Sequence, residues 1–267
     1  MKGQASETSW SSSALRGTRR VARWCFVFTT TLMALGFAGC ADDGDERDPA
    51  APAPPTLVDQ TFGAVDFVSG SAIAAFEICL EAEGGACAQS NEEGFALLQV
   101  PENGRYVVRL NADRYLGHLV YVALPGTRCD TCFYRMTMLS RSSLNLLARV
   151  IGADHAPENG LVAIGAVDID GQSVGGMSVR GPGGDVVGPV YFGSNGLPDL
   201  DATSALPGTQ AAFANVPPGQ QPFTLEGVTL IEGPGNRFRV AGTESLEVPV
   251  EAGHLTIIQA LVEPGAQ

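Results

Sequence analysis

The sequence predicts a mainly β protein: two tandem antiparallel β-sandwich domains joined by a short helix. Its 267 residues include 33 glycines and 17 prolines, a density that favours many turns and short strands. One strand-and-turn pattern occurs twice, and a single stretch with helical periodicity separates the two copies. These observations divide the chain into a signal peptide at 1–39, an acidic Ala/Pro-rich tether at 40–56, a first sandwich at 57–135, a helical connector at 136–158 and a second sandwich at 159–267.

Charge is distributed unevenly along the chain. The formal net charge is −13, which argues against a nucleic-acid-binding protein. Residues 1–39 contain five of the 16 basic residues and one of the 29 acidic residues, so the remaining chain has 11 basic and 28 acidic residues and a net charge of −17. Lys2 is the only lysine, which excludes Schiff-base chemistry and a P-loop lysine after residue 39.

The first 39 residues have the features of an export signal. Residues 1–24 are polar and basic, and an apolar run of 13 residues follows, from Cys25 to Phe37. A transmembrane helix needs about 20 apolar residues, whereas a signal peptide needs about 7–15. We therefore expect this segment to direct export and to be removed.

The end of this segment, Leu35-Gly36-Phe37-Ala38-Gly39-Cys40, resembles the lipobox of bacterial lipoproteins, with Phe37 where that family usually has leucine. The resemblance implies cleavage before Cys40, a diacylglyceryl group on its sulfur and an acyl chain such as palmitate on its amine. More than one chain is enough for stable anchoring. The expected location is the cell envelope, lipid-anchored in the outer membrane of a Gram-negative bacterium. An ordinary secreted protein and an uncleaved helix are the alternatives.

The repeated pattern begins with the same four residues. Gly63-Ala64-Val65-Asp66 recurs as Gly165-Ala166-Val167-Asp168, and in both copies a glycine turn and an alternating apolar strand follow. Later in each copy a strand ends in Val-Pro, at Val100-Pro101 and at Val216-Pro217. Further strands are predicted at 105–110 and 119–124 in the first copy, and at 228–231, 238–240, 245–250 and 255–262 in the second.

This order of strands and turns resembles the carboxypeptidase regulatory-like domain, which has a transthyretin-like β-sandwich. The resemblance covers 61–124 and 160–262, and its clearest motifs are Asp168-Ile169-Asp170-Gly171 and Val174-Gly175-Gly176. These motifs are structural, so the resemblance implies a fold and does not imply a chemistry.

One helix is predicted between the copies, within 137–152. Leu144, Leu147 and Ile151 lie at i, i+3 and i+7 on one helical face. Ser140 is a candidate N-cap, and Gly152 is a candidate C-terminal stop. Because an amphipathic stripe usually faces a core, we expect the helix to pack between the sandwiches as a structural connector.

Beyond Cys25 and Cys40 the chain has four cysteines: Cys79, Cys87, Cys129 and Cys132. Export places them in an oxidising compartment, so structural disulfides are expected. Local pairing, Cys79 with Cys87 and Cys129 with Cys132, and cross-pairing between the two sets both remain open. A redox CxxC needs a helix after a strand, and a four-cysteine zinc site needs two short CxxC pairs; the sequence favours neither.

Other catalytic and metal signals are weak. His118, His155 and His254 have no metal-binding spacing. The Gly-x-Ser-x-Gly string at Ser173 lies in a predicted hairpin turn and is not followed by a helix. Acidic pairs within 168–170 and 199–201 lack the further acids of an EF-hand loop. We predict no catalytic residue, no metal site and no cofactor.

If the protein has a binding surface, it is expected on a loop, because rigid sandwiches carry function on their loops; an ordinary surface insertion is the alternative. The first candidate is the long loop 193–207, which is rich in Gly, Asn, Pro and Asp, together with the aromatic residues before it. Tyr191, Phe192 and Asn195 are therefore the predicted ligand-binding residues.

Together these features predict a non-catalytic envelope lipoprotein that acts as a structural or ligand-binding module. Its expected partners are the membrane, through the lipid on Cys40, and an envelope protein or glycan, with no nucleic acid. One alternative is an accessory subunit of an envelope enzyme or secretion complex. Another is a thiol- or metal-dependent envelope enzyme that uses Cys129 and Cys132.

Overall fold

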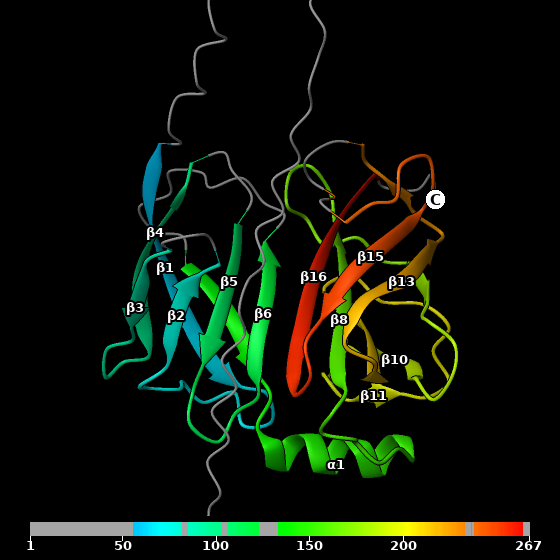
Figure 1. Cartoon of the computed structure of the whole chain (residues 1–267), viewed down its shortest axis with the longest axis horizontal. Helices are drawn as coiled ribbons and strands as arrows, with labels where there is room; N and C mark the ends of the chain where they lie inside the picture. Colours follow the sequence, from blue (N-terminus) through cyan, green and yellow to red (C-terminus); the bar gives the residue numbers. More distant parts are fainter. Residues whose placement is uncertain are drawn as a thin grey trace, which may run out of the picture. The chain divides into compact units, whose positions relative to one another are not determined.

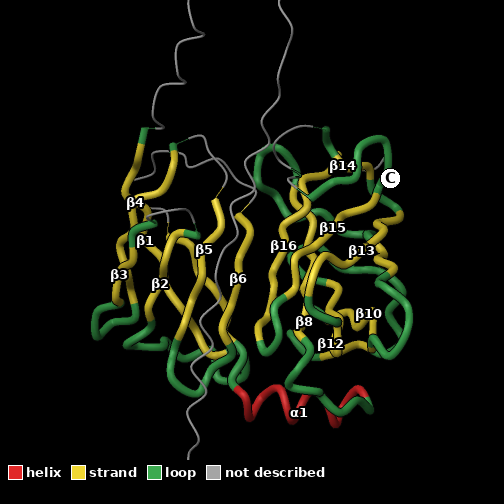
Figure 2. The backbone as a smooth tube through the Cα atoms, viewed as in Figure 1, coloured by secondary structure: helices red, strands yellow, loops and turns green. Residues whose placement is uncertain are grey.

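The computed structural model of the chain describes residues 56–81, 85–102, 106–122, 133–232, 236 and 238–263. These residues form a mainly β structure with one helix (Figure 1, Figure 2). The first half contains β1 (Leu57–Asp66), β2 (Glu77–Leu80), β3 (Cys87–Gln89), β4 (Phe95–Pro101), β5 (Tyr106–Asn111), β6 (Gly117–Val122) and β7 (Phe133–Met138), and is followed by α1 (Arg141–Ile151). The second half contains β8 (Gly160–Val167), β9 (Ser178–Arg180), β10 (Val187–Phe192), β11 (Pro198–Asp199), β12 (Ala211–Val216), β13 (Gly219–Glu226), β14 (Thr229–Leu230), β15 (Ser245–Val250) and β16 (His254–Glu263).

The strands form two small sheets and one long sheet. The small sheets have the strand orders β4-β1-β7 and β15-β13-β9. The long sheet has the order β11-β10-β12-β8-β16-β6-β5-β2-β3, and β14 pairs with β16. The two halves of the chain meet where β6 and β16 pair in parallel, with His118 opposite Leu255. This pairing is termed the junction.

The two halves repeat one arrangement of strands. In the first half β1 pairs antiparallel with β4 and parallel with β7, and in the second half β8 pairs antiparallel with β12 and parallel with β16. The opposing layer is β2-β5-β6 in the first half and β9-β13-β15 in the second. The internal repeat thus corresponds to two equivalent sandwiches. The long sheet joins the β2-β5-β6 layer of the first sandwich to the β12-β8-β16 layer of the second.

As a consequence, the two small sheets cover opposite faces of the long sheet. Val108 and Val120 are paired across β5 and β6, and both face the core under β4-β1-β7. On β16, Ile258 faces the core under β15-β13-β9. Ile258 is paired with Tyr121, the neighbour of Val120. Because successive side chains of a strand point to opposite faces, the two cores lie on opposite sides of the junction.

The repeated aspartate closes the turn after the first strand of each copy. The Oδ1 atom of Asp66 accepts hydrogen bonds from the N–H groups of Val68 and Ser69, at 3.0 and 2.8 Å. The Oδ1 atom of Asp168 accepts from the N–H groups of Asp170 and Gln172, at 3.0 and 2.7 Å. An aspartate side chain that bonds its own downstream backbone stabilises a turn, which explains why both copies have this residue.

Helix α1 has the termini that the sequence predicts. The N–H of Ser143 donates to Ser140 Oγ at 3.1 Å, and Gly152 ends the helix in the left-handed conformation with a φ of 69°. The buried face of α1 includes Leu144 and packs on Leu139 and Leu161, which belong to different halves. The helix therefore fastens the two sandwiches together at one end of the long sheet (Figure 1). Within the described part of the chain, no helix is long and apolar enough to span a membrane.

Some predicted boundaries differ from the structure. Strand β7 continues through Met138, past the predicted end of the first sandwich at 135. The strand predicted at 238–240 is a turn with one bridge, and Phe238 there packs edge-on against Tyr121 with ring centroids 4.6 Å apart. The short strands β3 and β11 are not among the predicted elements.

Candidate binding site

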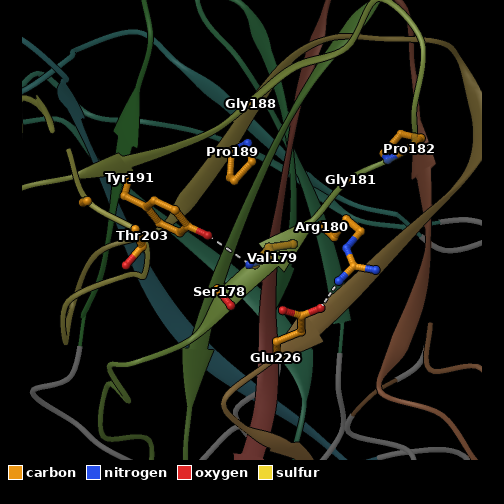
Figure 3. A pocket seen from close by; sticks show the side chains of 11 residues that line it. Ser178, Val179, Arg180, Gly181, Pro182, Gly188, Pro189, Tyr191, Thr203 and Glu226 are labelled. Atoms are coloured by element: carbon orange, nitrogen blue, oxygen red, sulfur yellow. Dashed lines mark hydrogen bonds and ion pairs between the residues drawn. The ribbon is translucent and has the colours of Figure 1, made fainter. Parts of the chain in front are cut away.

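A hollow of about 510 Å³ opens on the side of the second sandwich, between β9 and β10 (Figure 3). One wall is β9 with Gly181 and Pro182, and the other is the start of β10 at Gly188 and Pro189. Ala202, Thr203, Tyr191 and Glu226 complete the lining. Binding sites for small ligands commonly have volumes of about 300–1,000 Å³, so the hollow has room for one.

Two glycines bring both walls of the hollow close to the core. A Cβ atom at Gly181 would lie 2.7 Å from Cε1 of Phe213. A Cβ atom at Gly188 would lie 2.7 Å from the carbonyl oxygen of Ala212 and 2.8 Å from Cδ1 of Phe213. The φ of Gly188 is +138°, a conformation that L residues rarely adopt. The shape of the hollow therefore depends on glycine at both positions.

The free edge of β9 faces the hollow. On its other edge β9 pairs with β13, where Val179 lies opposite Leu225. The N–H of Val179 donates to the phenol oxygen of Tyr191 at 3.0 Å, so it points away from β13 (Figure 3). In an antiparallel strand the N–H and C=O of one residue point to the same side, and every second residue points alike. The C=O of Val179 is therefore directed into the hollow, and Gly181, the first residue after β9, also lines it.

A segment of the chain itself already pairs with the first part of this edge. The N–H of Gly176 donates to Ala205 O, and the N–H of Ala205 donates to Met177 O, both at 2.8 Å. The hollow begins where this pairing stops, beside Ala202 and Thr203. The backbone just before β9 thus already pairs with the loop residue Ala205, and the free edge of β9 lies next to this pairing.

The two charged side chains at the mouth of the hollow neutralise each other's charge. Arg180 and Glu226 form an ion pair, and their side chains are 74% and 51% exposed. Ser178 and Thr203 add two hydroxyl groups. Nucleophilic catalysis needs a nucleophile activated by an adjacent base. Among the residues that line the hollow, the described contacts form no such pair. The site can therefore bind a ligand through hydrogen bonds and a complementary shape.

The structure separates the three predicted ligand-binding residues. Tyr191 lines the hollow, but its side chain is 3% exposed and its hydroxyl is bonded to the backbone of β9. Phe192 packs edge-on against Phe67, with ring centroids 6.0 Å apart. Asn195 accepts the N–H of Leu197 within its own turn, at 3.0 Å. Phe192 and Asn195 do not line the hollow, which the edge of β9 defines instead.

Cys79 and Cys87 form a disulfide across the β2–β3 hairpin, with an S–S distance of 2.02 Å. This bond confirms the local pairing for these two cysteines and excludes their cross-pairing. Their sulfurs lie with a carboxylate oxygen of Glu77 in a group whose members are all within 4.8 Å of one another. Metal binding needs thiolates, and both of these sulfurs are in the disulfide. Cys40, Cys129 and Cys132 lie outside the described residues, so lipidation and a second disulfide stay predictions.

The other weak catalytic candidates lie in structural positions. His118 is 1% exposed, and its burial lowers its pKa to about 4. His254 lies at the start of β16, and His155 lies in the segment before β8. Ser173 is exposed in the turn after β8, where it bridges to Val167 and no helix follows. His118 and His254 lie on the paired strands β6 and β16 and interact electrostatically, but no described contact joins them to His155 or Ser173.

A charged cluster at the junction was not predicted from the sequence. Arg109 on β5 donates to Glu251 and to Glu81, and its Nη1 atom lies 3.2 Å from Nε2 of His254. Hydrogen bonds from Arg109 lower the pKa of Glu251, and the two carboxylates raise the pKa of Arg109. Because arginine has no acceptor, Nε2 of His254 accepts here, and its Nδ1 donates to Ala252 O at 3.0 Å. The contacts of Arg109 with Glu251 and His254 link the first half of the chain to the second at the junction.

No protein-family model matches this chain, and no curated protein matches it. Among solved structures, the chain is similar to the Bacillus anthracis TIE protein, with 13% identity, a TM-score of 0.23 and coverage of 77% of this chain and 34% of that chain. It is also similar to GBS52, the minor pilin of Streptococcus agalactiae, with 12% identity, a TM-score of 0.22 and coverage of 78% and 98%. BcpA, the major pilin subunit of Bacillus cereus, is similar with 8% identity, a TM-score of 0.24 and coverage of 78% of this chain and 100% of that chain. The chain thus spans about a third of the length of the TIE protein.

Proposed function

We propose that this protein is a lipid-anchored, non-catalytic binding module of a bacterial cell envelope. Lipid on Cys40 holds it in the outer membrane, and the acidic tether at 40–56 separates the anchor from the two sandwiches. The disulfide between Cys79 and Cys87 supports export, because disulfides persist in oxidising compartments and are rare in the cytosol. The lipobox-like end of the signal segment supports the anchor.

The observation that carries a binding role is the open edge of β9. An extended peptide that lies in the hollow can pair with the C=O of Val179, as an added strand does at a sheet edge. A glycan site relies on an exposed aromatic face, but the ring of Tyr191 is 3% exposed and the chain after residue 39 has no tryptophan. The hollow therefore fits an extended segment of a protein partner better than a sugar.

The anchor is tested by the intact mass of the protein extracted from native membranes without reductant. We expect the mass of residues 40–267 plus acyl chains, less four hydrogens for two disulfides. The variant Cys40→Ser should accumulate as an unprocessed precursor, and normal processing of that variant would contradict the anchor. Free thiols or a retained metal would instead favour the enzyme alternative at Cys129 and Cys132.

The binding role is tested by a photo-crosslinking amino acid placed at Thr203 in living cells. Thr203 lines the hollow, whereas Asn195 is exposed in a nearby turn outside it and is the matched control position. We expect a covalent adduct with an extended segment of one protein from Thr203 and none from Asn195. Adducts at both positions, or at neither, would contradict the proposed site. A single stoichiometric enzyme or secretion component as the partner would make this protein an accessory subunit.

A further inference from the structure

His118 closes a ring of three hydrogen bonds with two backbone segments. The N–H of Leu116 donates to Leu139 O at 3.0 Å, and the N–H of Leu139 donates to Nε2 of His118 at 3.2 Å. The Nδ1 atom of His118 lies 2.8 Å from Leu116 O. Since Nε2 accepts a hydrogen bond, the proton is on Nδ1, which donates to Leu116. The imidazole is neutral, and it completes the pairing between the two segments.

This ring of hydrogen bonds lies where β7 ends and α1 begins. The same two segments also meet at a bridge between Tyr115 and Ser140, the N-cap of α1. On the other side of β6, His118 is in register with Leu255 of β16 across the junction. A side chain that is 1% exposed therefore connects the segment before β6 to the segment that leads into α1, while the backbone of the same residue lies at the junction.

Protonation of the imidazole would disrupt this arrangement. A proton on Nε2 would face the N–H of Leu139, so two donors would oppose each other and the backbone group would lose its acceptor. A buried donor without a partner, beside a buried charge, destabilises the closed structure. Burial disfavours the charged ring and lowers the pKa of His118 to about 4; the hydrogen bond to Leu116 acts in the opposite direction, and His254 lowers the pKa further.

The elements around His118 offer little compensation for a positive charge. The titratable and charged residues on these elements are Tyr106 and Arg109 on β5, His254 and Glu263 on β16, Asp59 and Asp66 on β1, Tyr134 and Arg135 on β7, Arg141 and Arg149 on α1, Tyr121 on β6 itself, and Asp113, Arg114 and Tyr115 in the turn before it, whereas β8 has none. Among them, His254 is the group whose charge affects the pKa of His118, and it disfavours the protonated ring.

We propose that His118 is an acid-sensitive latch for α1, which fastens the start of the helix to the segment before β6 when neutral and releases it when protonated. The sandwiches stay folded on release, because each has a core of its own and α1 packs on a third, separate cluster. Release uncovers Leu144 and Leu147 on the packed face of α1, together with Leu139 and Leu161 on which this face packs. Acid would thus create an apolar surface at this end of the long sheet.

The latch is tested by amide hydrogen exchange on the mature protein, with β13 as an internal reference for global opening. A histidine in the released state has its ordinary pKa of about 6.5, so the protection of α1 should fall about tenfold for each pH unit between about pH 6.5 and pH 4. Global unfolding exposes His118 as well, so the protection of β13 also falls in acid, but it should stay above that of α1 throughout because release of α1 is local. Constant protection of α1, or protection of α1 equal to that of β13, would overturn the proposal.

Two variants test whether the pH dependence of α1 protection comes from the imidazole of His118. In His118→Gln the amide can accept from Leu139 and donate to Leu116 but does not titrate, so α1 should keep its protection in acid. His155→Gln is the control and should respond like the wild type. If His118→Gln does not fold, ¹⁵N spectra of the wild-type imidazoles decide: the ring of His118 should be the neutral Nδ1–H tautomer at neutral pH and should protonate together with the loss of α1 protection. Protonation without that loss would refute the latch.

Discussion

Arg109 and Glu251 form a two-point ion pair that bridges the two sandwiches. Nη1 of Arg109 donates to Oε2 of Glu251, and Nη2 donates to Oε1, both at 3.0 Å. The two residues are 142 positions apart in the sequence. Two parallel hydrogen bonds fix the relative orientation of a guanidinium and a carboxylate, so this pair helps to set how the halves join at the junction.

Removal of this pair should weaken the folded protein measurably. We expect Arg109→Gln to lower the free energy of unfolding by about 1–2 kcal/mol, because charge-assisted hydrogen bonds are lost at a partly buried site. Arg180→Gln is the matched control, since Arg180 and Glu226 form an exposed pair whose loss should cost less than about 0.5 kcal/mol. Urea unfolding at neutral pH measures both. Equal costs for the two variants would mean that the junction pair stabilises no more than a surface pair.

The advantage of the wild type over Arg109→Gln should also depend on pH. Bonds from Arg109 lower the pKa of Glu251 below its ordinary value of 4.5. The unfolded chain therefore binds more protons in acid, so the contribution is present above the ordinary pKa and is lost as the pH falls through the lowered one. The difference in unfolding free energy should shrink between neutral pH and about pH 3. A constant difference would assign the effect to packing of the arginine stem.

Gly117 should not tolerate a side chain. A Cβ atom there would lie 2.4 Å from Cδ2 and 2.6 Å from Nε2 of His254, the ring that contacts Arg109. We expect Gly117→Ala to lower the unfolding temperature by an amount that corresponds to about 1–3 kcal/mol, as overpacking does. Gly183→Ala, where a Cβ atom has no neighbour within 4 Å, should be neutral or slightly stabilising. His254→Ala should rescue Gly117→Ala in part, and additive effects would show that the ring is not the obstacle.

Features with local signals could be predicted from the sequence. Ser140 and Gly152 bound α1 as predicted, because a cap is an interaction between residues a few positions apart. The repeated aspartate, at Asp66 and Asp168, ends the first strand of each copy for the same reason. The predicted strand at 245–250 matches β15 in full.

Features that depend on distant pairing could not be predicted in this way. No local pattern encodes the parallel pairing of β6 with β16, on which the junction and its charged cluster depend. The hollow arises where Gly181 and Gly188 approach Phe213 from two different sheets. Tyr191 was predicted to bind ligand as an exposed aromatic residue, whereas the structure buries its ring and uses its hydroxyl to hold the edge of β9.

The disulfide at the far edge of the first sandwich should stabilise the protein without shaping the hollow. Cys79 and Cys87 are eight positions apart, and closing a loop of that size contributes about 2–3 kcal/mol in the chain-entropy model. The double variant Cys79→Ser/Cys87→Ser should lose about that much unfolding free energy and still give the crosslink at Thr203. Adding reductant to the double variant then tests the remaining pair. No further loss is expected if Cys129 and Cys132 contribute nothing to stability, whereas a second loss would show that they too form a structural disulfide.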